Sequence, residues 1–252
     1  MRHVPKTILL LLAACAPSQE AERVHLEVAV SGAALAASTN DLGWTVELTG
    51  ARVAVADLQF SILGEMHGAS AWLPSWLLAR AWAHPGHYAG GDVTGELGGD
   101  FILDWGGGGG PLGAAELLTG LYEGLNFTFR AAAASDGLAA DDPLLGHTAH
   151  FTGTARKGAD ALSFMAQLDV GAGTQMVGAP FELEVTRDDQ ATLALRFFPG
   201  DPVAGTSLFD GVDFAALDPD GDGVVVIAPG DEAHNIVRRE LQSHVHYDAI
   251  AE

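Results

Sequence analysis

The stretch GWTVELTGARVAVADLQF, residues 43–60, alternates apolar and polar side chains over most of its length. A period of two is typical of a half-buried β-strand, because successive side chains of a strand point to opposite faces. The first half places three apolar residues on one face: Trp44, Val46 and Leu48. In the second half, residues 53–60, the alternation shifts phase near Ala56 and Asp57. This shift predicts a second strand with a β-bulge at that point.

The same alternation recurs along most of the chain, in short runs separated by clusters of Gly, Pro or Asp. The further predicted strands are 24–30, 100–105, 124–131, 147–156, 161–169, 180–187 and 191–198. Many short strands with turn residues between them favour packed sheets over strand-helix-strand units. We therefore predict an all-β fold, an antiparallel Greek-key β-sandwich with short irregular insertions, formed by one domain over residues 24–252.

Three stretches depart from this pattern. Residues 69–82, ASAWLPSWLLARAW, predict either a short helix or an apolar loop that caps one end of the sandwich. Residues 231–250 place apolar side chains at helical spacing and predict a C-terminal helix. The run Gly106–Gly110 lacks the spacing and the following lysine of a phosphate loop, so we expect a flexible surface loop there.

The N-terminus has the features of an export signal. Residues 1–14 begin with basic side chains and continue with an apolar run that is far shorter than the roughly 20 residues needed to span a bilayer. Residues 12–15, Leu-Ala-Ala-Cys, resemble the lipobox of bacterial lipoproteins. This resemblance implies that Cys15 carries the lipid, that residues 15–23 form a tether, and that the protein is anchored to the outer membrane or cell surface through the lipid alone. The alternative is an ordinary secretory signal cut near Ala14, which leaves a free thiol.

The charge of the chain limits its partners. It holds 33 acidic and 12 basic side chains, a formal net charge of −21. Loss of residues 1–14 leaves 10 basic against 33 acidic side chains, a net charge of −23. Such a field repels nucleic acid and attracts cations. Since the sequence also lacks a Gly-x-Ser-x-Gly elbow, a His-Glu-x-x-His pair and a phosphate loop, we do not expect an enzyme.

The stretch RAWAHPGHYAGGD, residues 80–92, places two histidines around a Pro-Gly pair. His84 and His87 occupy the ends of a predicted type II turn, whose terminal Cα atoms lie within about 7 Å of one another. Both imidazoles are then able to reach one metal ion. Trp82, two residues before His84, faces the same way in extended backbone. A tight turn with surface histidines is the simpler alternative.

Histidines elsewhere compete to complete such a site. The candidates are His67, His150, His244 and His246. Because His147 and His150 are three residues apart, we expect them on opposite strand faces, so at most one serves a common site. We expect His25 and His234 to be surface residues. Imidazole ligands without thiolates favour copper, with zinc as the alternative.

The order of these features resembles the bacterial surface copper-binding proteins of the MbnP-like and CorA/MopE type. The lipobox comes first, then residues 43–60, then the Trp-x-His motif of Trp82 and His84, and finally strands and a histidine-bearing tail. The resemblance implies a β-rich outer-membrane or released protein that binds copper through histidines beside a tryptophan that can be oxidised to kynurenine. It implies that Trp82 is this aromatic residue and that His84 is a ligand, and it leaves the second histidine open.

The stretch DPDGDG, residues 218–223, sets three aspartates at alternate positions, the spacing with which calcium loops gather oxygen ligands. These residues are Asp218, Asp220 and Asp222. The twelfth position, where an EF-hand needs a bidentate Glu, is Pro229. We therefore expect a shorter calcium turn, completed by the carbonyl of Val224 and by Asp231 or Glu232. The alternative is an acidic hairpin turn.

Three functions follow as hypotheses. The first is a lipid-anchored surface protein that binds copper for acquisition, storage or delivery. The second is a structural or adhesive surface module stabilised by calcium. The third, a redox enzyme with bound copper, needs an open coordination position and a substrate pocket. The sequence does not define a protein partner for any of them.

Overall fold

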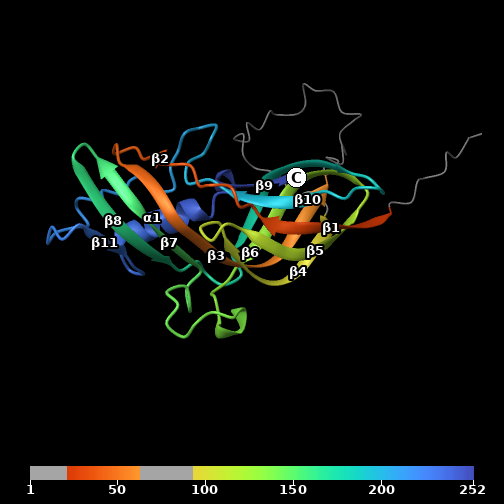
Figure 1. Ribbon diagram of the computed structural model, residues 1–252, viewed down its shortest axis with the longest axis horizontal. Coiled ribbons are helices and arrows are strands. Elements are labelled where there is room, and N and C mark those ends of the chain that lie inside the picture. Colours follow the sequence, from red (N-terminus) through yellow and green to blue (C-terminus); the bar gives the residue numbers. More distant parts are fainter. Residues whose placement is uncertain (1–21, 63–92) are drawn as a thin grey trace, which may run out of the picture.

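The computed structural model describes residues 22–62 and 93–252. Within these ranges it contains twelve strands in one sheet, one α-helix and two short 3-10 helices (Figure 1). The strands are β1 (Arg23–Val30), β2 (Ser38–Thr39), β3 (Thr45–Ile62), β4 (Val93–Asp104), β5 (Gly110–Leu118), β6 (Gly120–Phe129), β7 (Ala149–Lys157), β8 (Asp160–Leu168), β9 (Gln175–Val185), β10 (Thr192–Phe197), β11 (Val224–Ile227) and β12 (Tyr247–Ala251). The helices are η1 (Ala134–Asp136), α1 (Glu232–Leu241) and η2 (His244–His246). The predicted all-β fold with a C-terminal helix is confirmed, and the predicted segment 69–82 lies outside the described residues.

β3 organises the sheet, because it pairs with β2, β4, β6 and β7. Arg52 pairs with both β4 and β7, and Val55 pairs with both β4 and β6. β7 and β6 therefore follow one another along one edge of β3, while β4 lies along the other edge. The two strands predicted from residues 43–60 are the two halves of this single long strand.

The predicted bulge at Ala56 and Asp57 is confirmed. The register with β4 and the register with β6 both shift after Ala56. Asp57 has a φ of 54°, which places it in the left-handed region, and its Oδ1 accepts a hydrogen bond from the N–H of Gly99 at 3.2 Å. The side chain thus holds the bulge against β4. β3 leaves β7 after Val53 and pairs with β6 from Val55, just before the bulge.

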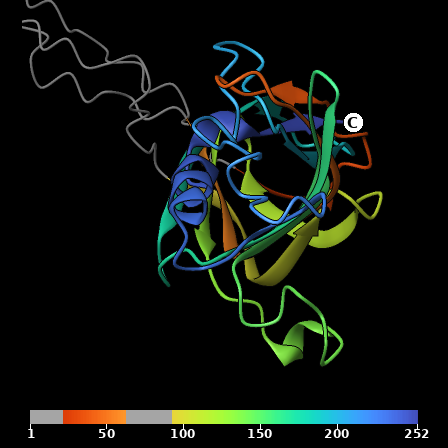
Figure 2. The same cartoon turned by 90° about the vertical axis from the view of Figure 1, so that its left-hand side faces the viewer.

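Eight of the described strands form a closed circuit. From β3 the sheet runs through β4, β5, β1, β10, β12 and β9 to β6, which pairs back with β3. β7, β8 and β11 extend the sheet from the first half of β3. Viewed from the end that carries β8 and β11, the strands curl around a common interior, and α1 lies to one side (Figure 2). Three pairs, β1–β10, β9–β12 and β8–β11, are parallel, and the other described pairs are antiparallel.

Aromatic side chains fill the interior in two groups. Inside the circuit the ring centroid of Phe197 lies 5.0 Å from that of Trp105 and 5.5 Å from that of Tyr247. Beneath β8, Phe164 contacts the rings of Phe209 and Phe214 at 5.2 and 5.3 Å. The second group anchors the long segment between β10 and β11, which brings the acidic stretch 218–223 to the edge of the sheet.

The run Gly106–Gly110 was expected to be a flexible surface loop; it lies at the surface, where Gly106, Gly107 and Gly108 are exposed, and it is closely packed at two positions. A Cβ added at Gly106 would lie 2.6 Å from the Cα of Gly50, and one added at Gly109 would lie 2.3 Å from the carbonyl oxygen of Val30. The run is a tight turn pressed against the backbones of β1 and β3, and Gly110 already belongs to β5. Glycine is required at Gly106 and Gly109 because a side chain would clash with neighbouring backbone, whereas Gly108 and Gly110 have open space and positive φ values.

The predicted helix over 231–250 is correct only in its first half. α1 ends at Leu241, η2 follows, and residues Tyr247–Ala251 form β12. Tyr247 and Ala249 are buried on one face of this strand, and β12 pairs with β10 along its whole length. Pairing with a distant strand therefore overrides the local helical spacing.

Candidate functional site

The aspartate loop, residues 218–223, is the strongest candidate for a metal site. One carboxylate oxygen from each of Asp218, Asp220 and Asp222 lies within 4.8 Å of the other two. Among the described residues, no other group of three His, Cys, Asp or Glu ligand atoms is this close. The fold therefore brings together the three aspartates that the sequence spacing selected.

The local backbone explains this convergence. Gly221 and Gly223 have φ values of 70° and 81°, which fold the chain back on itself. The Asp218 carboxylate accepts hydrogen bonds from the N–H groups of Asp222 at 3.1 Å and Gly223 at 3.2 Å. Asp222 Oδ1 accepts one from the N–H of Val224 at 2.8 Å. Each carboxylate oxygen has two lone pairs, so these bonds orient the oxygens and leave room for a cation.

The surroundings of the loop determine which further ligands would complete the coordination of an ion. Asp218 is half-buried, whereas Asp220 and Asp222 are exposed. A shallow cavity of about 420 Å³, whose lining includes Asp160 and Asp218, gives water access to the loop. The predicted additional ligand Asp231 instead accepts the N–H of Ala228 at 2.9 Å. Of the described acidic residues, only the three aspartates form the close group.

His150 is held in a buried polar cluster on β7. Its Nδ1 lies 3.4 Å from the guanidinium of Arg52, which is paired with Asp142 at 2.8 and 2.9 Å. Burial lowers the pKa of His150, and the positive charge of Arg52 lowers it further. Its Nε2 is buried and has no hydrogen-bond partner among the described residues. The ring is therefore neutral at pH 7, but it is not exposed for a shared site.

His246 is fully buried, and His244 begins the short helix η2. The Nδ1 of His246 donates to the carbonyl of Phe198 at 2.8 Å, and burial lowers the pKa of this imidazole. The two residues lie in one 3-10 turn, not in the extended chain that a shared face requires. His147, just before β7, pairs with Asp169 at 2.7 Å.

The two histidines expected at the surface differ. His25 is exposed and lies 3.9 Å from Glu116. His234 is buried, which corrects the prediction: its Nε2 accepts the N–H of Asp169 at 3.1 Å. The spacing of His234, Val237 and Leu241 on α1 is the signal that sequence reasoning missed, since all three share one helix face.

The remaining predicted metal and lipid residues lie outside the described residues. They are Cys15, His67, Trp82, His84 and His87. The structure therefore neither groups nor separates the histidine corner and its partners.

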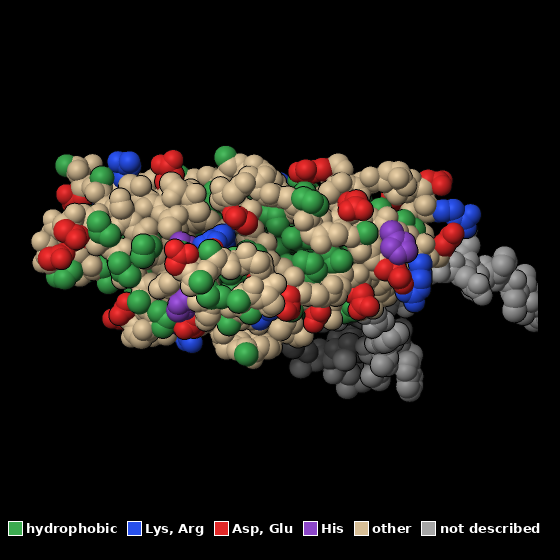
Figure 3. Space-filling model, turned by 60° about the horizontal axis from the view of Figure 1, so that its bottom comes forward, with side chains coloured by type: hydrophobic (Ala, Val, Ile, Leu, Met, Phe, Trp, Pro, Cys, Tyr) green, Lys and Arg blue, Asp and Glu red, His purple; other side chains and the backbone are tan. Residues whose placement is uncertain are grey.

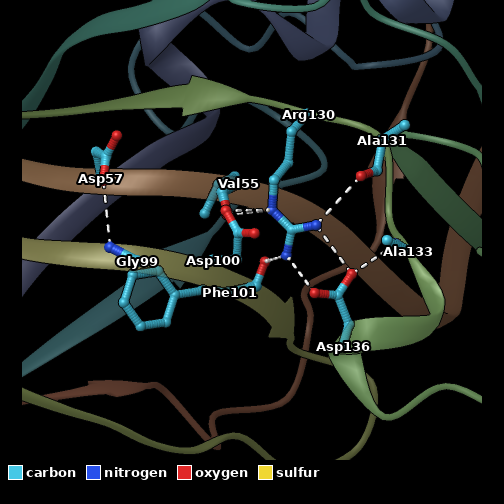
Figure 4. Close-up of polar contacts among 9 residues, drawn as sticks. All are labelled: Val55, Asp57, Gly99, Asp100, Phe101, Arg130, Ala131, Ala133 and Asp136. Carbon is cyan, nitrogen blue, oxygen red and sulfur yellow. Dashed lines mark hydrogen bonds and ion pairs between the residues drawn. The ribbon is translucent and has the colours of Figure 1, made fainter.

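Two partly buried arginine clamps were not anticipated. In Figure 4 the guanidinium of Arg130 donates to both carboxylate oxygens of Asp136 at 2.9 Å, and to the carbonyls of Val55, Ala131 and Phe101. The second clamp is the pair of Arg52 and Asp142. Together the two clamps fix residues 130–148, the segment between β6 and β7, to β3. The hydrogen bonds to arginine are the main cause of the lowered pKa of each aspartate.

The surface agrees with the strongly acidic composition. On the face shown in Figure 3, Asp and Glu side chains are spread over the whole length of the molecule, with fewer Lys and Arg.

Among the described residues, no helix is long and apolar enough to cross a membrane. No known protein family, no curated protein and no solved structure matches the chain.

Proposed function

We propose that the protein is a structural or adhesive surface module in which Ca²⁺ binds to the aspartate loop. The observation that carries this proposal is the convergence of one oxygen from each of Asp218, Asp220 and Asp222 within 4.8 Å. The ion would join the segment that leaves the aromatic core to the first residues of β11.

The chemistry of the loop favours calcium over other metals. Ca²⁺ takes about 6–8 oxygen ligands at roughly 2.3–2.6 Å and tolerates irregular geometry. The loop offers carboxylates without a close imidazole or thiolate, whereas zinc and copper prefer nitrogen and sulfur. Binding also relieves the mutual repulsion of three neighbouring negative charges, so Ca²⁺ should stabilise the fold.

The test is a pair of matched asparagine variants. Asp220→Asn removes one exposed ligand, and Asp188→Asn makes the same change in the exposed turn between β9 and β10. Saturating Ca²⁺ should raise the melting temperature of the unaltered protein and of Asp188→Asn, and the rise should be much smaller for Asp220→Asn. Equal shifts in all three proteins, or none at millimolar Ca²⁺, would refute the calcium site.

Copper binding is a second candidate, supported by the sequence around Trp82, His84 and His87 and by the resemblance to surface copper-binding proteins. We propose that His84 and His87, together with a remote histidine, bind copper, with zinc as the alternative ion, for acquisition, storage or delivery. Elemental analysis after copper loading should give close to one copper per chain, and the double variant His84→Ala/His87→Ala should lose it. An unchanged copper content would rule out this corner.

Export and anchoring are part of both proposals. We propose that Cys15 is lipidated and holds the protein at the outer membrane or cell surface. Cys15→Ser should move the protein from the membrane fraction to the soluble fraction of the cell envelope. Retention of this variant in the membrane fraction would contradict a lipid anchor.

A further inference from the structure

β11 is the last strand at one end of the sheet; it lies beside β8, on the edge of β8 that faces away from β7. Among the described residues it pairs with β8 and with no other strand. The N–H of Ser163 donates to the carbonyl of Gly223 at 2.9 Å. Because backbone groups alternate in direction along a strand, those of Val225 and Ile227 also face β8, and those of Val224 and Val226 face the open edge.

The outer face of this edge is apolar. Val225 and Ile227 are fully buried, but Val224 and Val226 are 49% and 51% exposed. Met165 of β8, in register with Val226, is 40% exposed beside them. Edge strands of native proteins are usually protected by charged residues, proline or a bulge. The run Val224–Ile227 carries no charge and no proline. The N–H of Val224 donates to Asp222 Oδ1, so the carbonyl of Val224 and both backbone groups of Val226 are open to pairing with another strand.

Acidic residues stand at both ends of β11. Asp222 is exposed before the strand, and Asp231 and Glu232 are exposed after it. If a second copy of the chain paired its own β11 here, acidic ends would meet in either orientation. The net charge of −21 adds long-range repulsion between copies. Charge complementarity therefore selects a basic occupant and opposes self-association.

We propose that β11 is a docking edge for an extended, basic segment of another protein, which adds to the sheet as a further strand. The backbone of the segment would pair with the carbonyl of Val224 and with both backbone groups of Val226, and its alternate apolar side chains would cover these valines and Met165. Lys or Arg residues at its two ends would face Asp222 and Asp231. This mode uses backbone hydrogen bonds for affinity and side-chain alternation for selectivity. The proposal concerns the calcium-free chain, in which the Asp222 carboxylate is not neutralised by a bound ion.

The test uses a fluorescent peptide of the sequence Lys-Lys-Thr-Val-Thr-Val-Thr-Val-Lys-Lys and the purified full chain in EGTA, with fluorescence anisotropy as the readout. We expect saturable binding that Val226→Lys weakens at least tenfold. The matched control Val177→Lys places the same charge at a 40% exposed valine of β9 and should change affinity less than twofold. A peptide with N-methyl groups at alternate residues should bind at least tenfold more weakly, and this readout does not depend on how a variant folds.

Three results would overturn the proposal. The first is no saturable binding of the peptide at millimolar concentration. The second is equal affinity for the N-methylated peptide, which would mean that charge alone drives the binding. The third is a dimer in sedimentation velocity that Val226→Lys dissociates, because a second copy would then occupy the edge.

Discussion

Replacing Arg130 with methionine tests whether the partly buried clamp of Arg130 and Asp136 holds residues 130–148, the segment between β6 and β7. The Arg130 side chain is 14% exposed. Arg130→Met keeps most of its apolar stem and removes the guanidinium. Three backbone carbonyls lose a donor, and the Asp136 carboxylate, 5% exposed, loses its bidentate partner. Asp100 also lies 3.3 Å from Arg130 but is largely exposed, so it contributes little.

The expected loss is large because a buried charge is left without its partner. Breaking a buried ion pair by removing one member typically costs about 3–5 kcal/mol. The N–H of Ala133 still donates to Asp136 at 2.7 Å, which limits the loss to the lower part of that range. The double variant Arg130→Met/Asp136→Asn should be more stable than the sum of the single losses predicts, by at least about 1 kcal/mol.

Urea denaturation at pH 7, followed by circular dichroism, measures these free energies of unfolding. Arg187→Met serves as the control, because Arg187 is 74% exposed and pairs with Glu22 at the surface. It should change stability by less than about 0.5 kcal/mol. A loss below about 1 kcal/mol for Arg130→Met, or strict additivity in the double variant, would show that our reasoning about the clamp is wrong.

The same clamp predicts a dependence on acid. The pKa of Asp136 is lowered, chiefly by its hydrogen bonds with Arg130. Its contribution to stability is therefore complete above the unfolded pKa of about 3.9 and is lost as the pH falls through the folded value. The difference in stability between the unaltered protein and Arg130→Met should narrow below pH 4. A constant difference down to pH 2 would contradict the assignment.

Three further predictions concern single residues. Burial lowers the pKa of His246, so this neutral imidazole stabilises the fold above its unfolded pKa of about 6.5 and loses that effect as the pH falls. Between pH 7 and pH 5 the free energy of unfolding should therefore fall less for His246→Gln than for the unaltered protein. An equal fall in both proteins would argue against this role. Asp57→Ala should lower the free energy of unfolding by about 1–2 kcal/mol, measured by thermal unfolding, because the variant loses the hydrogen bond to Gly99 and keeps the positive φ. Asp57→Asn should be nearly neutral. Equal losses in the two variants would exclude the side-chain hydrogen bond. Gly109→Ala should cost about 2–4 kcal/mol, because its Cβ would press on the Val30 carbonyl at a φ of 76°, and near-native stability would mean that the turn is looser than described.

The sequence predicts the elements whose burial follows a regular period. β3 and its bulge were visible because the alternation of apolar side chains changes phase at Asp57. β1, β7, β8 and β10 were predicted close to their observed bounds for the same reason. β5 was missed because its sequence, GPLGAAELL, hardly alternates in polarity. It is a strand because β1 pairs with it over eight residues, which is a tertiary effect.

The candidate site divides in the same way. The three aspartates of the loop lie within five residues, so their spacing alone predicts the cluster. The clamp between Arg52 and Asp142 joins residues 90 positions apart, and no local sequence pattern predicts it. His246 was proposed as a ligand from its neighbours in sequence, yet its burial depends on the pairing of β12 with β10. Long-range pairing is the information that one sequence does not display.

The calcium site is tested most directly by a crystal structure of the protein grown in Ca²⁺, with data collected for anomalous scattering. We predict one anomalous peak between Asp218, Asp220 and Asp222, with carboxylate oxygens at about 2.3–2.6 Å. Well-ordered density for the loop without such a peak, at a Ca²⁺ concentration in the millimolar range, would contradict the proposed calcium site.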